Sequence, residues 1–298
     1  MALLRLSEDV LGTILVQLFK LQPSPTLAVY FISACRELRE LLMPVLQQQL
    51  KKALCLKVGT SWKALREARE ISWVHQGLSM ADLTTLGTLG SVLPELEDLR
   101  LVEYPAGANG GRQLAEKLGA GALPGVTSLR LGMPVGNAGA SALAAALDRG
   151  ALLRLKVLAL SNAAIGDAGL AALAPALRWW PALESLSLWG NPLGDEGLAA
   201  LVAPAPLAGA RRRRRRPAAG GRRVRALPPQ AGGLKRLRTL DLGETQVTDA
   251  GCAALAAALY RGALPALENL YLDGIPASAA AKQAAQVALA RSRMARSE

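Results

Sequence analysis

The amino-acid sequence predicts an α/β fold built as a solenoid, in which short parallel strands and helices alternate along one axis. Three observations predict it. The frame Leu-x-x-Leu-x-Leu returns at intervals near 28 residues over most of the chain. Each copy is followed by a Gly-containing turn and a stretch of Leu and Ala at helical spacing. Of the 298 residues, 51% are hydrophobic but only 4% are aromatic, which is typical of repeat proteins.

The expected strands lie where the Leu frame occurs. Clean copies begin at residues 96, 155, 183, 237 and 267, with a near copy at 126 and a weaker first copy at 68. The successive steps are 28, 30, 29, 28, 54 and 30 residues, so the step of 54 corresponds to two repeats with one frame missing. Because one strand-helix unit cannot bury its leucines alone, the copies are expected to stack around a continuous core.

The expected helices follow a recurrent turn. In the copy Ile165-Gly166-Asp167-Ala168-Gly169, the Asp suits the N-cap of the helix that follows, since its carboxylate can accept free backbone N–H groups. Downstream, Gly169, Leu173 and Leu177 recur at spacing four and so share one helix face. The same spacing occurs in residues 110–118, 139–147 and 251–259.

These residues resemble leucine-rich repeats of the ribonuclease-inhibitor type, and the resemblance covers about residues 68–298. It implies a curved leucine-rich repeat solenoid with parallel strands on the concave face and helices on the convex face. The family's consensus Asn after the strand is present as Asn191 but is replaced by Ala163, Pro134 and Thr245 in other copies. The usual ladder of backbone-bonding asparagines is therefore expected to be incomplete.

A protein partner is expected on the concave face. Strand side chains alternate between the two faces, so the residues between the frame leucines point away from the core. Exposed aromatic and arginine side chains are typical of interface hot spots. The candidate partner-binding residues are Asp98, Arg100, Arg130, Trp189, Asp241 and Tyr271. The alternative for each is an ordinary solvated strand residue.

Residues 1–67 do not fit the repeat and are expected to form a helical N-terminal segment. Leu6-Ser7-Glu8-Asp9-Val10-Leu11, with later apolar residues at helical spacing, resembles an F-box, a helical unit that docks on the adaptor of cullin-based ubiquitin ligases. The resemblance implies docking through Leu6, Val10, Leu11, Ile14 and Leu15. The alternative is a cap that shields the leucines of the first repeat, because solenoid ends need capping.

The missing frame falls on a run of arginines. A strand starting at residue 211 would drive about three guanidinium groups into a leucine core, at several kcal/mol each. We therefore expect an Arg-, Pro- and Gly-rich loop over 204–233. One interpretation is a solvated low-complexity remnant; another is a nuclear-localisation or polyanion-binding element. The residues of that element would be Arg211, Arg212, Arg213, Arg214, Arg215 and Arg216. A nucleic-acid site is disfavoured, since no aromatic residue is interleaved for base stacking.

Composition disfavours catalysis and membrane insertion. The formal charge is +12, but the arginines between 211 and 225 supply nine of these charges. There is one histidine and no P-loop motif, so we expect no enzyme activity, cofactor, metal site or small-molecule substrate. Cys35, Cys55 and Cys252 are expected to be free thiols. Without a secretory start or an apolar run of about 20 residues, a cytoplasmic and/or nuclear location is expected.

Two functional hypotheses follow. The first is a non-enzymatic protein-interaction scaffold, with substrate reception for a cullin-based ubiquitin ligase as its specific form. The second is a leucine-rich repeat regulator or activator of a small GTPase or another partner. In that case residues 1–67 serve only as a solenoid cap.

Overall fold

The computed structural model describes residues 48, 51–79, 82–83, 86, 93–102, 107–119, 123, 125–178, 180, 182–203 and 234–295. Within these ranges one parallel sheet has the strand order β1-β2-β3-β4-β5-β6-β7, which is also the chain order. The strands are β1 (Glu70–Val74), β2 (Asp98–Val102), β3 (Ser128–Leu131), β4 (Val157–Ala159), β5 (Ser185–Ser187), β6 (Thr239–Asp241) and β7 (Asn269–Tyr271).

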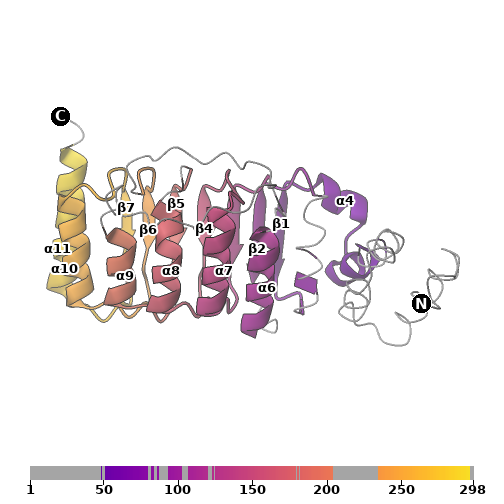
Figure 1. Ribbon diagram of the computed structural model, residues 1–298, viewed down its shortest axis with the longest axis horizontal. Helices are drawn as coiled ribbons and strands as arrows, with labels where there is room; N and C mark the ends of the chain where they lie inside the picture. The colour runs from indigo at the N-terminus through magenta and orange to yellow at the C-terminus, as the bar shows by residue number, and fades with distance from the viewer. Residues whose placement is uncertain are drawn as a thin grey trace, which may run out of the picture.

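A layer of helices runs beside the sheet, so that strands and helices stack along one axis (Figure 1). The helices are α4 (Trp62–Glu67), α6 (Gly107–Gly119), α7 (Gly136–Asp148), α8 (Asp167–Arg178), α9 (Asp195–Val202), α10 (Asp249–Tyr260) and α11 (Ala279–Met294). From α6 onward each helix packs on the helix of the next repeat. The arrangement confirms the predicted leucine-rich repeat solenoid.

The frame leucines form the core between the two layers. Leu158, Leu186 and Leu240 are paired across neighbouring strands and are fully buried. The flanking frame leucines are buried in the same cluster, which extends from Leu54 to Leu289. A continuous core of this kind is the reason why single repeats need neighbours.

From α7 to α10, a side chain at the start of each helix bonds to the next repeat. Asp167 Oδ1 accepts hydrogen bonds from Gly194 N at 2.7 Å and Gly197 N at 2.8 Å, in the first turn of α9. Asn137 binds the start of α8 in the same way, through Gly166 N and Gly169 N. We refer to this series, which continues with Asp195 and Asp249, as the capping ladder.

The capping ladder corrects the sequence prediction that each Asp caps its own helix. The N-cap residues of α9 and α10 are Gly194 and Thr248, and each ladder Asp is instead the first residue of its helix. Its carboxylate points to the helix of the next repeat. The contact also explains why the third residue of α9 is Gly197. A Cβ at this position would lie only 2.6 Å from Asp167 Oδ1.

Asn191 has the backbone-bonding role that its position predicts. It is buried, its Oδ1 accepts from Ala163 N and Ile165 N, and its Nδ2 donates to Leu160 O at 2.6 Å. Thr245, at the equivalent position of the next repeat, donates only to Leu242 O of its own repeat. Of Asn191 and Thr245, only Asn191 joins two repeats. This agrees with the expectation that the ladder of asparagines is incomplete.

The solenoid is continuous across the arginine-rich segment. β5 pairs directly with β6, with Ser185 opposite Thr239. On the helix side, Asp195 Oδ1 accepts from Thr248 N at 2.8 Å, across 53 positions of sequence. Residues 204–233, including the candidate polyanion-binding residues Arg211 to Arg216, lie outside the described residues. The prediction of a loop there stays a prediction.

At the N-terminal end, residues 51–58 are helical and α4 follows, capped by the Ser61 hydroxyl, which accepts from Ala64 N. Leu54 and Leu65 are buried in the same core as the repeats. The five candidate adaptor-docking residues, Leu6, Val10, Leu11, Ile14 and Leu15, lie outside the described residues. At the other end, α11 covers the last repeat through Ala285, Ala288 and Leu289.

Candidate partner-binding face

The sheet presents a regular array of side chains on the side away from the leucine core. Alternate strand residues are buried, and the positions between them face away from the core, so each repeat contributes three outward positions at or just after its strand. Ser128 and Gly243 occupy such positions but are themselves buried. We call this surface the open face. In strand order its positions are Glu70, Ser72 and Val74; Asp98, Arg100 and Val102; Ser128, Arg130 and Gly132; Val157, Ala159 and Ser161; Ser185, Ser187 and Trp189; Thr239, Asp241 and Gly243; and Asn269, Tyr271 and Asp273.

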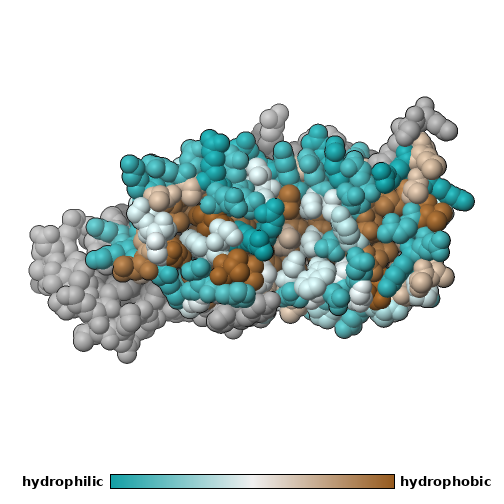
Figure 2. Space-filling view, turned by 180° about the vertical axis from the view of Figure 1, so that it is seen from behind, coloured by the Kyte–Doolittle hydropathy of each residue, from teal (hydrophilic) through white to brown (hydrophobic). Residues whose placement is uncertain are grey.

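All six candidate partner-binding residues occupy outward positions of the open face. Figure 2, seen from behind relative to Figure 1, shows polar and apolar side chains interspersed on that side of the molecule.

No helix of the described part of the chain is long and apolar enough to cross a membrane.

The first half of the open face contains an ion pair. Arg130 donates to both carboxylate oxygens of Asp98, at 2.9 and 2.6 Å. Both side chains are partly exposed, so the pair contributes at most about 1 kcal/mol to stability. Arg100 lies beside Arg130 in the register and is exposed, with no ion pair among the described residues. This half of the face therefore offers a guanidinium group to a partner.

The middle of the open face consists of small side chains. Ala159 and Ser187 are neighbours in the β4–β5 register, between the Arg130 and Asp241 positions. Val157 and Ser185 are neighbours in the same pair of strands. Short side chains leave the backbone accessible here. A partner can therefore approach the sheet closely between the larger side chains of the first and last strands.

The last half of the open face joins two exposed aromatic residues to a fixed carboxylate. Asp241 accepts from Ser187 Oγ at 2.8 Å and from Gly243 N at 3.0 Å. The indole of Trp189 lies over Gly243, because a Cβ there would be 2.7 Å from Trp189 Cδ1. Trp189 is 39% exposed and Tyr271, paired with Asp241 in the register, is 49% exposed.

The sequence analysis did not single out two residues of this half. Gly243 provides the space that the Trp189 indole occupies, and Asp273 is an exposed carboxylate at the outward position after β7. The signal for Asp273 was its equivalence to Trp189 and Gly243 in the repeat frame. Gly243 gave no chemical signal, because its role depends on a side chain from the previous repeat.

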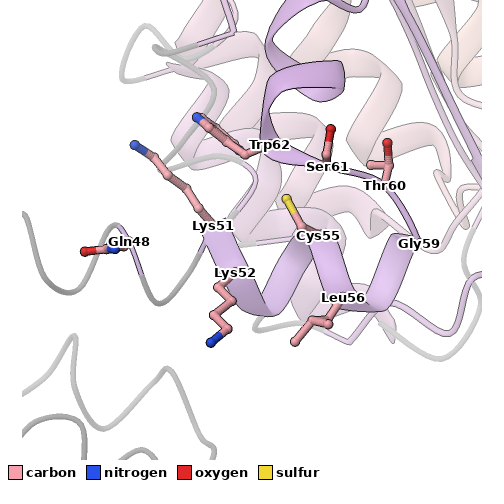
Figure 3. Close-up of a pocket in the computed structure, with 9 residues that line it drawn as sticks. All are labelled: Gln48, Lys51, Lys52, Cys55, Leu56, Gly59, Thr60, Ser61 and Trp62. Atoms are coloured by element: carbon pink, nitrogen blue, oxygen red, sulfur yellow. The ribbon is translucent and has the colours of Figure 1, made fainter.

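A pocket lies at the N-terminal end, between the helix of residues 51–58 and the start of α4 (Figure 3). Its volume is about 630 Å³, and Leu56 at its edge is 74% exposed. Lys51 Nζ lies 4.8 Å from the centroid of the Trp62 ring, a cation–π contact. Burial raises the pKa of the Cys55 thiol, which disfavours the reactive thiolate.

Two features of the described residues bear on metal binding and thiol chemistry: the placement of the metal-ligating side chains and the state of the cysteines. No group of three or more His, Cys, Asp or Glu side chains is placed to hold a metal ion in that part of the chain. Cys55 and Cys252 are free thiols, as expected, and burial raises the pKa of Cys252 as well. Cys35 lies outside the described residues.

Comparison with protein families agrees with this architecture. The family model described as Leucine Rich repeat matches residues 155–174, 181–202 and 235–256. The matches correspond to the repeats of β4, β5 and β6, and the second and third flank the arginine-rich segment. No curated protein matches the chain. The chain therefore carries leucine-rich repeats, a type of domain that commonly serves as a protein-interaction scaffold.

Proposed function

We propose that this leucine-rich repeat chain is a non-enzymatic scaffold that binds a protein partner on the open face. The observation that carries the proposal is the exposure of Trp189 and Tyr271 beside Asp241 in the last half of the open face. The few residues that contribute most of the binding free energy at protein interfaces are enriched in Trp, Tyr and Arg.

The dimensions of the face support a protein rather than a small molecule as the partner. Six strand-to-strand intervals of about 4.8 Å give a length of about 29 Å, close to the diameter of a small domain. The face carries outward side chains at every strand instead of one enclosed cavity. Small-molecule sites are usually concave cavities that bury most of the ligand.

The test is quantitative affinity capture with the full-length chain as bait. We expect the double variant Trp189→Ala and Tyr271→Ala to lose at least tenfold of its specific partner, since each truncated hot-spot residue costs about 1 kcal/mol or more. Tyr260→Ala is a matched control, because Tyr260 is 57% exposed but lies on α10, on the helix side. Loss of the partner in the control and its retention in the double variant would place binding on the helix side instead.

A more specific form of the proposal makes the chain a substrate receptor of a cullin-based ubiquitin ligase. It is supported by the F-box-like spacing of Leu6, Val10, Leu11, Ile14 and Leu15 in the sequence. Titration calorimetry of the full chain against the ligase adaptor tests it, with Leu6→Arg as the control. Micromolar or tighter binding that Leu6→Arg abolishes is the expected result. A folded chain that binds no adaptor would leave regulation of another partner, such as a small GTPase, as the function.

The arginine run is proposed as an element separate from the open face, active in nuclear localisation or polyanion binding. Its support is the density of guanidinium groups from Arg211 to Arg216. Replacement of residues 211–225 by Gly and Ser should abolish nuclear accumulation and the salt dependence of heparin binding. If neither changes, the arginine run has no such role. Both a cytoplasmic and a nuclear pool are expected on this basis.

A further inference from the structure

We infer that the last half of the open face recognises an arginine side chain of the partner. The inference rests on the proposed function and specifies the chemistry of its partner. We call Trp189, Asp241, Tyr271 and Asp273 the aromatic–acidic patch. Among the outward positions of β4 to β7 there are two carboxylates and no Lys or Arg, although the whole chain has a formal charge of +12.

The carboxylate of Asp241 is held in one orientation but keeps free acceptor capacity. Each of its oxygens accepts one intramolecular hydrogen bond, from Ser187 Oγ and from Gly243 N. An ionised carboxylate has about four lone-pair sites, so both oxygens can accept a further bond. A planar guanidinium can use both at once, whereas an ammonium group binds as a point charge.

The two aromatic side chains lie on either side of this carboxylate. Tyr271 is the register neighbour of Asp241 on β7, at about 4.8 Å in the backbone. Trp189 reaches from the β5 repeat over Gly243, two residues after Asp241. A cation within about 6 Å of the Trp189 ring would therefore be close to Asp241 as well. Stacking on an aromatic ring together with a bidentate carboxylate is the pattern that favours arginine over lysine.

Charge complementarity argues for a basic segment of the partner as the occupant. Asp273 adds a second exposed carboxylate at the outward position after β7. The cations closest in sequence to Asp241 are Lys235, Arg236 and Arg238, and they precede β6, whereas Trp189, Gly243 and Asp273 follow their strands. The cation closest in sequence to Asp273 is Lys282, whose Nζ donates to Ile275 O at 2.9 Å. Arg238 is also paired with Glu268 at 3.5 Å, at that other edge of the sheet.

The test uses a labelled hexa-arginine peptide as the probe, with the full-length chain, read by fluorescence anisotropy at low ionic strength. Because the whole chain carries a net positive charge, it repels a polycation on average, so any binding must occur at a local acidic surface. The double variant Asp241→Asn and Asp273→Asn should bind about fivefold more weakly, and so should Trp189→Ala. Asp241→Asn keeps Oδ1 as the acceptor for Gly243 N, and its Nδ2 can donate to Ser187 Oγ, so both contacts are retained with the direction of the second reversed. A hexalysine peptide should bind the unaltered chain several-fold more weakly than hexa-arginine.

The matched control is Glu184→Gln with Glu268→Gln, which removes two carboxylates at the edge where the strands begin. We expect this control to bind hexa-arginine as the unaltered chain does. Equal weakening in the control and in the patch variant would overturn the inference. Binding that appears only when residues 211–225 are replaced by Gly and Ser would also overturn it, since the patch would then be covered by the chain's own arginines.

The inference and the proposed function fail separately. If the variant Asp241→Asn with Asp273→Asn captures the natural partner at the normal level in the affinity experiment, arginine recognition is wrong but the open face can still be the binding surface. If Trp189→Ala with Tyr271→Ala leaves capture unchanged, the two aromatic residues are excluded as the binding hot spot and the proposed function loses the observation that carries it.

Discussion

Asp167→Ala is the most direct test of the capping ladder. The side chain accepts two backbone hydrogen bonds from the first turn of α9, at 2.7 and 2.8 Å. The N-cap of α9 is Gly194, which has no side chain to replace them. Loss of a capping side chain costs about 0.5–2 kcal/mol, and the loss of two bonds to one carboxylate places this variant at about 2 kcal/mol. For a domain of this size the melting temperature should fall by roughly 4–8 °C.

Urea unfolding measures the global effect, and hydrogen exchange in residues 193–202 measures the local one. The control is Glu196→Ala, which removes a neighbouring carboxylate of the first turn of α9 and should cost only about 0.3–1 kcal/mol through the helix dipole. Asp167→Asn should retain most of the stability, because Asn137 makes the equivalent pair of bonds at 2.8 and 3.2 Å. If Glu196→Ala is as destabilising as Asp167→Ala, helix electrostatics and not capping across repeats accounts for the effect.

Three further outcomes are expected. Asn191→Ala should destabilise the chain by about 3 kcal/mol or more in urea unfolding, because it leaves buried backbone groups without partners; a loss below about 1 kcal/mol would contradict this. Gly197→Ala should cost about 1–3 kcal/mol by crowding Asp167, and less than that in an Asp167→Ala background; strictly additive costs would show that no such contact exists. Hydrogen bonds from the Ser278 backbone and side chain lower the pKa of Asp249, so its stabilising contribution is present above the unfolded pKa near 3.9 and lost as pH falls through the lower folded value. Ser278→Ala should make the loss of stability between pH 5 and 2 shallower, and an unchanged slope would refute this.

The repeat frame was sufficient to predict the sheet. The side chains of Leu158, Leu186 and Leu240 are buried at the positions that the spacing indicates, and the outward positions of Asp98, Arg100, Arg130, Asp241 and Tyr271 follow from the alternation of strand side chains. Such local periodicity depends on few residues at a time. It can therefore be read within one repeat.

Contacts between repeats could not be predicted from the periodicity within one repeat. The carboxylate of Asp167 is equally suited to its own helix and to the next one, and only the stacking distance decides between them. The same reason explains why Gly243 carried no signal, since its space is filled by Trp189 from another repeat. Trp180 is buried, and its Nε1 donates to Leu155 O of the previous repeat, a partner that its own surroundings in sequence do not indicate.

The step of 54 residues shows why an insertion need not interrupt a solenoid. The connection between α8 and β5 has 6 residues and that between α9 and β6 has 36. Lengthening a flexible connection from 6 to 36 residues would cost only about 1.6 kcal/mol of loop-closure free energy. A strand of arginines within the core would cost several kcal/mol for each buried charge. The direct pairing of β5 with β6 is thus the less costly arrangement, and it brings Trp189 and Asp241 together although 52 positions of sequence separate them.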